Sequence, residues 1–296
     1  MGEKDIAEKT LESYNDVFAD IVNGLLFDGE QVVKEDELEA ESEHSMYKAD
    51  GKLHEQERDV AKYWKNGEIR IALYGLENQT VADPDMPLRV FSYDGAAYRN
   101  QLNMEKGQKR YPVITLVLYF GDERWNRNKT LLECLDVPDR LKPYVNDYKI
   151  NLFEICTLTD SQISCFKSDF MIVADYFAKR NKIPDYRGSR ETIKHVDEFF
   201  KLMKVLTNDN KFETLYNENM MKNGGATMDT FLDSVMEKGE KKGKLEGKLE
   251  GKIIGKAEII QTMIKKGNMT IEQIAAMLEL PVEKVKELAE MVLVTA

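Results

Sequence analysis

The residues best suited to chemistry flank a predicted β-hairpin. Asp59 opens the run DVAKYW, and Glu77 and Gln79 close the run IRIALYGLENQ, with Asn66-Gly67 between the two runs. Asn-Gly between β-rich runs is a strong hairpin signal, and the two-residue period of a strand places Glu77 and Gln79 on one side of the sheet. Carboxylates from two neighbouring strands form a minimal site for a hard cation such as Mg²⁺. The sequence therefore predicts a metal site at the end of this hairpin.

The pairing of the two strands leaves a second interpretation open. If Asn66-Gly67 is a two-residue turn, Asp59 faces Tyr74, and Glu77 lies about 10 Å further along the strand. A longer turn, or a bulge at Gly75, would bring the two acids together. Otherwise Asp59 is a strand-end cap and Glu77 is a surface acid.

The apolar pattern predicts the elements that position these residues. Helical spacing is present in residues 8–27 and 86–102, whereas 69–77, 111–120 and 148–155 have the composition of strands. The runs 69–77 and 111–120 are too apolar to have a solvated face, so we expect them to be neighbours in the centre of the sheet.

Two further regions complete the first 206 residues. An acidic stretch at 28–43 is expected to be a solvated loop around a short strand at Gln31–Val33. Residues 166–181 and 189–206 are predicted to be amphipathic helices, separated by a breaker region around Pro184 and Gly188. Strands and helices alternate first, and helices follow, which favours an α/β core with a helical extension.

The C-terminal region has a repeat of its own. A glycine recurs at every fourth position, at Gly239, Gly243, Gly247, Gly251 and Gly255. We expect residues 232–262 to form a long helix that self-associates through this glycine stripe into a homodimer, with a flexible Gly/Lys linker as the alternative. Residues 270–290 are predicted to form two short helices joined at Leu280-Pro281, as either a structural hairpin or a helix-turn-helix DNA reader.

Composition limits the possible functions. The chain has 296 residues and a formal net charge of −11, so any contact with nucleic acid must come from local basic patches or a metal ion. The longest apolar run, at 113–120, is too short to cross a bilayer, and the first residues lack the apolar core of a signal peptide. We therefore expect a soluble, cytoplasmic protein with no membrane association.

The hairpin and the segments around it resemble a known group of proteins. Asp59, a hairpin, and then Glu77-x-Gln79 resemble the PD-(D/E)XK nuclease superfamily, with Gln79 where lysine is commoner. The stretches YNDVFADIVNGLLF, IALYGLENQT, MPLRVFSYDGAAYRNQL and YPVITLVLYFGDERW, in this order, are similar to the bacterial recombination-promoting nuclease and putative transposase family. The resemblance covers roughly residues 8–180 together with the glycine-repeat tail.

This resemblance implies a fold and a division of the chain. The implied fold is α/β, a restriction-endonuclease-like mixed sheet flanked by helices, with a helical C-terminal extension. The expected parts are a nuclease-like core at 1–160, a helical extension at 161–231, a glycine-repeat basic helix at 232–262 and a small helical hairpin at 263–296.

The resemblance also implies an activity and residues for it. Asp59 and Glu77 would bind Mg²⁺, Gln79 would position water or polarise phosphate, and Asp16, with Asp20 as second choice, would add an acid from the opening helix. The expected activity is Mg²⁺-dependent hydrolysis of DNA by an endonuclease acting in recombination or left from a mobile element. The alternative is a nuclease-fold protein that has lost catalysis and acts as a DNA-binding or assembly module.

Basic residues outside the hairpin are candidate DNA contacts. Arg89 and Arg99 lie on the helix predicted at 86–102, and Lys109 and Arg110 lie in the loop before the strand at 111–120. Solvated surface positions are the alternative for all four.

Overall fold

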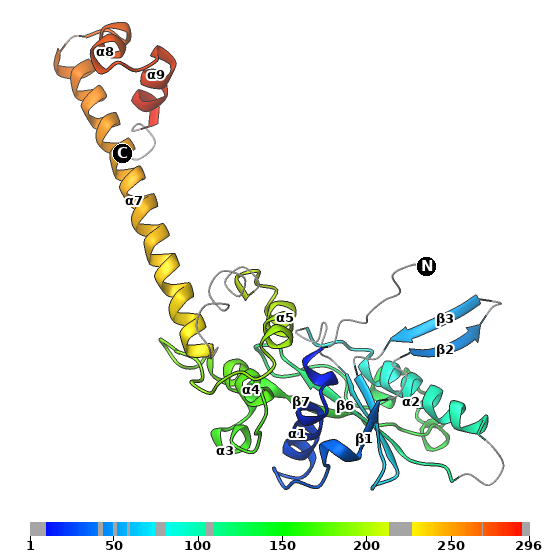
Figure 1. Cartoon of the computed structure of the whole chain (residues 1–296). Helices are drawn as coiled ribbons and strands as arrows, with labels where there is room; N and C mark the ends of the chain where they lie inside the picture. Colours follow the sequence, from blue (N-terminus) through cyan, green and yellow to red (C-terminus); the bar gives the residue numbers. More distant parts are fainter. Residues whose placement is uncertain are drawn as a thin grey trace, which may run out of the picture. The chain divides into compact units, whose positions relative to one another are not determined.

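The computed structural model divides the chain into two compact units, Met1–Leu232 and Asp233–Ala296 (Figure 1). The structure describes residues 10–40, 44–49, 52–57, 60–74, 81–104, 109–212, 227–267 and 269–291. Three residues of the predicted active site, Asp59, Glu77 and Gln79, lie outside the described residues.

A five-stranded mixed sheet forms the centre of the first unit. Its order is β1-β4-β5-β6-β7, with antiparallel pairing from β1 to β5 and parallel pairing from β5 to β7. The strands are β1 (Leu38–Ala40), β4 (Val60–Trp64), β5 (Ile69–Tyr74), β6 (Val113–Tyr119) and β7 (Asn151–Glu154). A separate two-stranded sheet pairs β2 (His44–Ala49) with β3 (Lys52–Glu57). The predictions of an α/β class, and of two apolar central strands side by side, are confirmed.

Helices cover both faces of the sheet (Figure 1). Helix α2 (Met86–Leu102) spans the range predicted for it and links the parallel neighbours β5 and β6. Val117 and Tyr119 of β6 pack in one buried cluster with residues of α2. The alternate residues Leu116 and Leu118 are fully buried on the other face. Helix α1 (Asn15–Leu26) lies on this second face, which explains why β6 is apolar throughout.

The β4–β5 hairpin has the predicted register but a longer loop. Trp64 pairs with Ile69 and Val60 pairs with Leu73, which is the register of a two-residue turn at Asn66-Gly67. The connecting loop nevertheless includes four residues, and Glu68 has the left-handed conformation, with φ of 49°. Gly67 is required for packing, because a Cβ there would lie 2.2 Å from the ring of Trp64.

The short strand predicted at Gln31–Val33 is wrong. Residues 31–33 are not in a strand, because the side chain of Asn23 satisfies their backbone. Its Oδ1 accepts hydrogen bonds from the backbone N–H of Val32 (3.1 Å) and Val33 (2.9 Å), and its Nδ2 donates to the carbonyl of Val33. A buried side-chain amide therefore replaces the partner strand.

The helical part of the first unit follows the sheet. It contains α3 (Asp160–Ile163), α4 (Phe170–Lys179) and α5 (Val196–Thr207). The helix predicted from residue 189 begins only at Val196, because the backbone N–H groups of Lys194 and His195 donate to the carboxylate of Asp169 instead of entering the helix. Residues 189–195 therefore form a connecting segment.

The second unit is a long helix followed by a helical hairpin. Helix α7 (Met228–Gly267) begins in the first unit and includes all five repeating glycines, so the flexible-linker alternative is wrong. Helices α8 (Ile271–Leu278) and α9 (Val282–Met291) pack on its end around Ala257, Ile260 and Val285. Thr270 caps α8 and forms a capping box with Gln273.

The middle of α7 is intrinsically a poor helix. Each glycine costs about 1 kcal/mol relative to alanine, so five amount to about 5 kcal/mol.

Within the described part of the chain, no helix combines the length and the apolar composition needed to cross a membrane.

Candidate functional site

The described ends of β4 and β5 mark where the predicted active site begins. Val60 pairs with Leu73, and the parallel pairing of Tyr74 with Val117 brings the C-terminal ends of β5 and β6 to the same edge of the sheet. Asp59 directly precedes Val60, and Glu77 follows Tyr74 by three residues. We call this the active-site edge, and the end with the Asn66-Gly67 loop the hairpin-loop edge.

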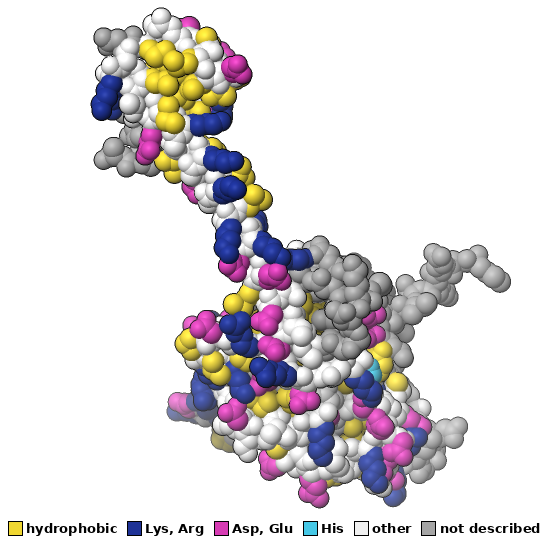
Figure 2. Space-filling view, turned by 60° about the vertical axis from the view of Figure 1, so that its left-hand side comes forward, with side chains coloured by type: hydrophobic (Ala, Val, Ile, Leu, Met, Phe, Trp, Pro, Cys, Tyr) yellow, Lys and Arg dark blue, Asp and Glu magenta, His cyan; other side chains and the backbone are white. Residues whose placement is uncertain are grey.

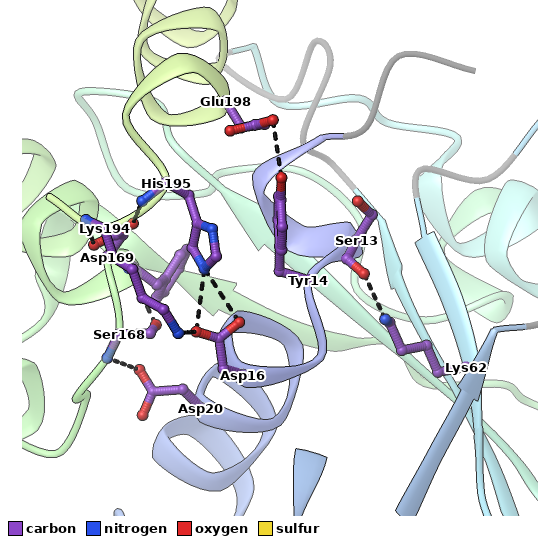
Figure 3. Close-up of polar contacts among 11 residues, drawn as sticks. Ser13, Tyr14, Asp16, Asp20, Lys62, Ser168, Asp169, Lys194, His195 and Glu198 are labelled. Carbon is purple, nitrogen blue, oxygen red and sulfur yellow. Dashed lines mark hydrogen bonds and ion pairs between the residues drawn. The ribbon is translucent and has the colours of Figure 1, made fainter. Parts of the chain in front are cut away.

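Asp16 lies in a polar cluster that joins α1 to the start of α5 (Figure 3). One of its carboxylate oxygens is 2.6 Å from Nζ of Lys194, and its two oxygens are 3.1 and 3.3 Å from Nε2 of His195. Burial by itself raises the pKa of Asp16, but the hydrogen bonds from Lys194 and His195 together bring the pKa below its ordinary value. The carboxylate is therefore held ionised by a cation and an imidazole.

His195 is held in place by Tyr14 and Asp169 in addition to Asp16. Its ring stacks on Tyr14 with centroids 3.8 Å apart, and its backbone N–H donates to Asp169 at 2.6 Å. The hydroxyl of Tyr14 donates to Glu198 at 2.9 Å, and this hydrogen bond is the largest cause of the raised pKa of Tyr14. His195 thus takes part in the contact between α1 and the start of α5.

Asp20, the second choice for a metal-binding acid, serves the backbone. It is 5% exposed, and its carboxylate accepts the backbone N–H groups of Lys167 (2.9 Å) and Ser168 (2.7 Å) (Figure 3). Asp20 therefore fixes the segment before α4, as Asp169 fixes the segment before α5. Both carboxylates border an open recess of about 480 Å³ that is also lined by Lys34, Lys167 and Lys194.

Two buried charged residues were missed from the sequence. Lys62 of β4 is 3% exposed, and its ammonium donates to the carbonyl of Ser13 at 2.6 Å and to the side chain of Asn15 (Figure 3). Glu12, just before Ser13, is fully buried. The signal for Lys62 is its place in VAKYW, where alternation puts it on the same face as Val60 and Trp64.

A buried acid on the α2 face was also missed. Asp94 of α2 is 1% exposed and accepts the hydroxyl of Thr115 at 2.6 Å and the hydroxyl of Tyr148. Burial is the largest cause of the raised pKa of Tyr148, followed by this hydrogen bond. These hydrogen bonds join α2, β6 and the segment before β7. They satisfy the buried polar groups of the three residues, so the cluster has a packing role.

The basic residues predicted to contact DNA are divided between the two edges of the sheet. Arg89, near the start of α2, lies toward the active-site edge and donates to Asp83 at 2.9 Å. Lys109 and Arg110 precede β6 at the hairpin-loop edge, where Lys109 is 3.9 Å from Glu68. Arg99, near the end of α2, lies toward that second edge, because Gln101 contacts the backbone of Tyr111. The structure does not bring the four residues together.

Two arginines at the active-site edge were not identified from the sequence. Arg124 and Arg127 are exposed and line a recess of about 330 Å³ together with Tyr119 and the acids Asp122 and Glu123. Their loop is held by buried Trp125, whose backbone N–H donates to Glu154 at 2.7 Å and whose ring N–H donates to the carbonyl of Arg127 at 2.9 Å. The loop therefore presents two cations from a fixed backbone.

The described residues contain no group of three or more His, Cys, Asp or Glu side chains placed to hold a metal ion. The helical hairpin α8–α9 also lacks a basic face, since Lys284 pairs with Glu287 at 2.7 Å. Asp59 and Glu77, which the sequence predicts to hold a metal, are outside the described residues.

A mixed sheet with an antiparallel hairpin, a parallel crossover and helices on both faces defines an α/β protein. The family model described as "Putative transposase, YhgA-like" matches residues 63–211, and the chain belongs to this family. No curated protein and no solved structure matches the chain.

Proposed function

We propose that the chain is a Mg²⁺-dependent DNA endonuclease with a restriction-endonuclease-like core. The observation that carries the proposal is the strand order, because β4, β5 and β6 bring the described chain ends next to Asp59 and Glu77 to one edge of the sheet. Continued by one residue, the observed register puts position 59 opposite Tyr74, three residues before Glu77, so the proposal includes a bulge at Gly75 that brings the two carboxylates to one ion. Membership of a transposase family supports DNA as the substrate. Cytoplasmic location is consistent with such a substrate and is part of the proposal.

Asp59 and Glu77 would hold the ion in this proposal. Carboxylates are the ligands that Mg²⁺ prefers, and they leave coordination positions for water and phosphate oxygens. When bound, the metal would activate a water molecule and stabilise charge on the scissile phosphate. Gln79 would orient that water or the phosphate without contributing charge. Asp16 is left out of the metal set, because Lys194 and His195 already engage its carboxylate.

The DNA strand would approach along the active-site edge. Arg124 and Arg127 would neutralise backbone phosphates there, together with Arg89, whereas Lys109 and Arg110 are at the opposite edge of the sheet. Such local contacts are required because the net charge of −11 gives no general attraction to DNA.

The proposal is tested by nicking of supercoiled plasmid with Mg²⁺ or with EDTA. Asp59→Ala and Glu77→Ala should each abolish Mg²⁺-dependent nicking, whereas Asp139→Ala, at an exposed carboxylate, should retain it. Asp16→Asn should also retain nicking. Activity that persists undiminished in Glu77→Ala would show that these residues do not form the site.

Titration of the protein with Mn²⁺ separates the alternative function. The alternative is a non-catalytic DNA-binding protein, and the uncharged side chain of Gln79 favours it. Such a protein would bind DNA without cleaving it. If Mn²⁺ binding requires Asp59 and Glu77 but plasmid remains intact, catalysis has been lost.

A further inference from the structure

Helix α7 has an apolar stripe that nothing in the described chain covers. Leu245, Leu249 and Ile253 follow one another at intervals of four residues and are 61%, 54% and 40% exposed. Four residues are slightly more than one helical turn, so the three side chains lie along one side of the helix. Figure 2 shows apolar and lysine side chains at the surface along this helix. Every residue from 236 to 254 is exposed.

The same stretch of helix has little internal support. The side-chain ion pairs in this part of the helix are Lys241–Glu237, Lys244–Glu240 and Lys242–Glu246. Among the described residues, Lys248, Glu250 and Lys252 have no ion pair, and Gly251 lies between the last two. A solvated helix of this composition is marginal, and helices in proteins are stabilised mainly by packing of an apolar face. The apolar stripe is therefore the face through which a partner would stabilise the helix.

The apolar stripe, rather than the glycine stripe, is suited to pairing in water. Gly247, Gly251 and Gly255 each follow a residue of the apolar stripe by two positions, just over half a turn, so the two stripes face nearly opposite ways there. Apart from the adjacent residues and the nearby backbone of the helix itself, no described atom lies within 4 Å of a Cβ built on any of the five glycines. Pairing through glycines would bury little apolar surface, and burial of apolar surface drives association in water. A contact between the glycine stripe of one copy and the leucine stripe of another would not close and would extend into a filament.

The flanking charges favour a second copy in parallel orientation. Lysines precede the apolar residues, at Lys244 and Lys248, and glutamates follow them, at Glu246 and Glu250. In a parallel pair related by a two-fold axis, the lysine flank of one helix meets the glutamate flank of the other. In an antiparallel pair, like flanks would meet, and like charges repel.

We propose that α7 pairs in parallel with α7 of a second copy of this chain through Leu245, Leu249 and Ile253. This inference is independent of the nuclease proposal. The interface is on the face of α7 opposite the glycines. Because glycine has no side chain, the glycines keep the outer surface of the pair narrow.

Sedimentation velocity of the full chain at increasing concentration measures the pairing. The wild-type protein should form a dimer of the 34.1 kDa chain. Leu245→Glu should raise the dissociation constant at least tenfold, because it places a charge in the apolar contact. Met236→Glu is the matched control: Met236 is 49% exposed on the same helix, nine residues or two and a half turns before Leu245, and its substitution should leave the dimer intact.

Charge exchange tests the flanks. The variant Glu246→Lys/Glu250→Lys and the variant Lys244→Glu/Lys248→Glu should each be monomeric, and an equimolar mixture of the two should restore a dimer. All of these substitutions are at exposed positions. Circular dichroism reports folding, and the helical signal should rise with concentration in the wild type.

Oxidative cross-linking of Leu245→Cys tests the orientation. In a parallel pair, residue 245 of one copy lies next to residue 245 of the other. Leu245→Cys should therefore form a disulfide-linked dimer without a second variant, and the wild type is the control for Cys134, Cys156 and Cys165. A monomeric wild type at every concentration would overturn the proposal. So would a dimer that Leu245→Glu leaves unchanged, or one cross-linked only in a mixture of Leu245→Cys with Ile253→Cys.

Discussion

At the scale of single residues, the most informative side chain is Gln79. A lysine at this position would place a cation near the charge that develops on phosphate, and such a cation stabilises the transition state. Gln79→Lys should therefore retain nicking or increase it, and Gln79→Ala should be intermediate because the metal supplies most of the stabilisation. Single-turnover rates of nicking of supercoiled plasmid measure the effect, and a Gln79→Lys protein less active than Gln79→Ala would contradict it.

Asp16 predicts a dependence of stability on pH. Its pKa in the folded protein is below the ordinary value of 3.8, so the stabilisation is complete above that value and is lost as the pH falls through the lowered pKa. Asp16→Asn should therefore be less stable than the wild type at pH 6, and the difference should shrink below about pH 4. Urea unfolding at pH 6, 5, 4 and 3 measures this.

Asp139→Asn provides the control for that experiment. Its carboxylate is 93% exposed in a surface pair with Lys142, and such pairs contribute little. Its unfolding midpoint should match the wild type throughout. If the difference in unfolding free energy between wild type and Asp16→Asn stays constant down to pH 3, the ion pair of Asp16 is not its cause.

At the scale of elements, the loop with Arg124 and Arg127 predicts how DNA binding responds to salt. Each phosphate neutralised contributes about 0.9 to the slope of log K against log salt. Arg124→Ala/Arg127→Ala should weaken binding and reduce that slope by roughly 2. Lys109→Ala/Arg110→Ala, at the hairpin-loop edge, should change neither quantity. Fluorescence anisotropy of labelled duplex DNA at several salt concentrations measures both, and equal losses in the two variants would reject the assigned edge.

The cap of α8 predicts a local loss of stability. Thr270→Ala removes the side-chain oxygen that accepts the N–H of Gln273, which should cost about 1 kcal/mol. Thr262→Ala is the control, since the Thr262 hydroxyl bonds a carbonyl in the middle of α7 and caps no helix end. Hydrogen exchange of the α8 amides should accelerate in the first variant only.

Local patterns predicted those elements whose packing agrees with their sequence. Helix α2 and the hairpin register were predicted in this way, because apolar spacing, Pro87 and Asn66-Gly67 act within a few residues. Residues 31–33 and 189–195 were not, because Asn23 and Asp169 supply hydrogen-bond partners from elsewhere in the chain. The roles of Lys194 and His195 were not predicted for the same reason, because their partner Asp16 lies almost 180 residues away in the sequence.

At the scale of the whole molecule, that long separation affects how the chain folds during synthesis. The contacts of α1 with residues 167–198 join the beginning of the first unit to its last third: Asp20 with Lys167, Asp16 with His195, and Tyr14 with Glu198. A ribosome adds roughly 5–20 residues per second, so α1 emerges about 10–35 s before its partners do. These three contacts cannot form during that time. The nascent chain is therefore most exposed to chaperones and to misassembly before α5 is complete, and a ribosome stalled shortly before Lys194 should hold α1 in a protease-sensitive state.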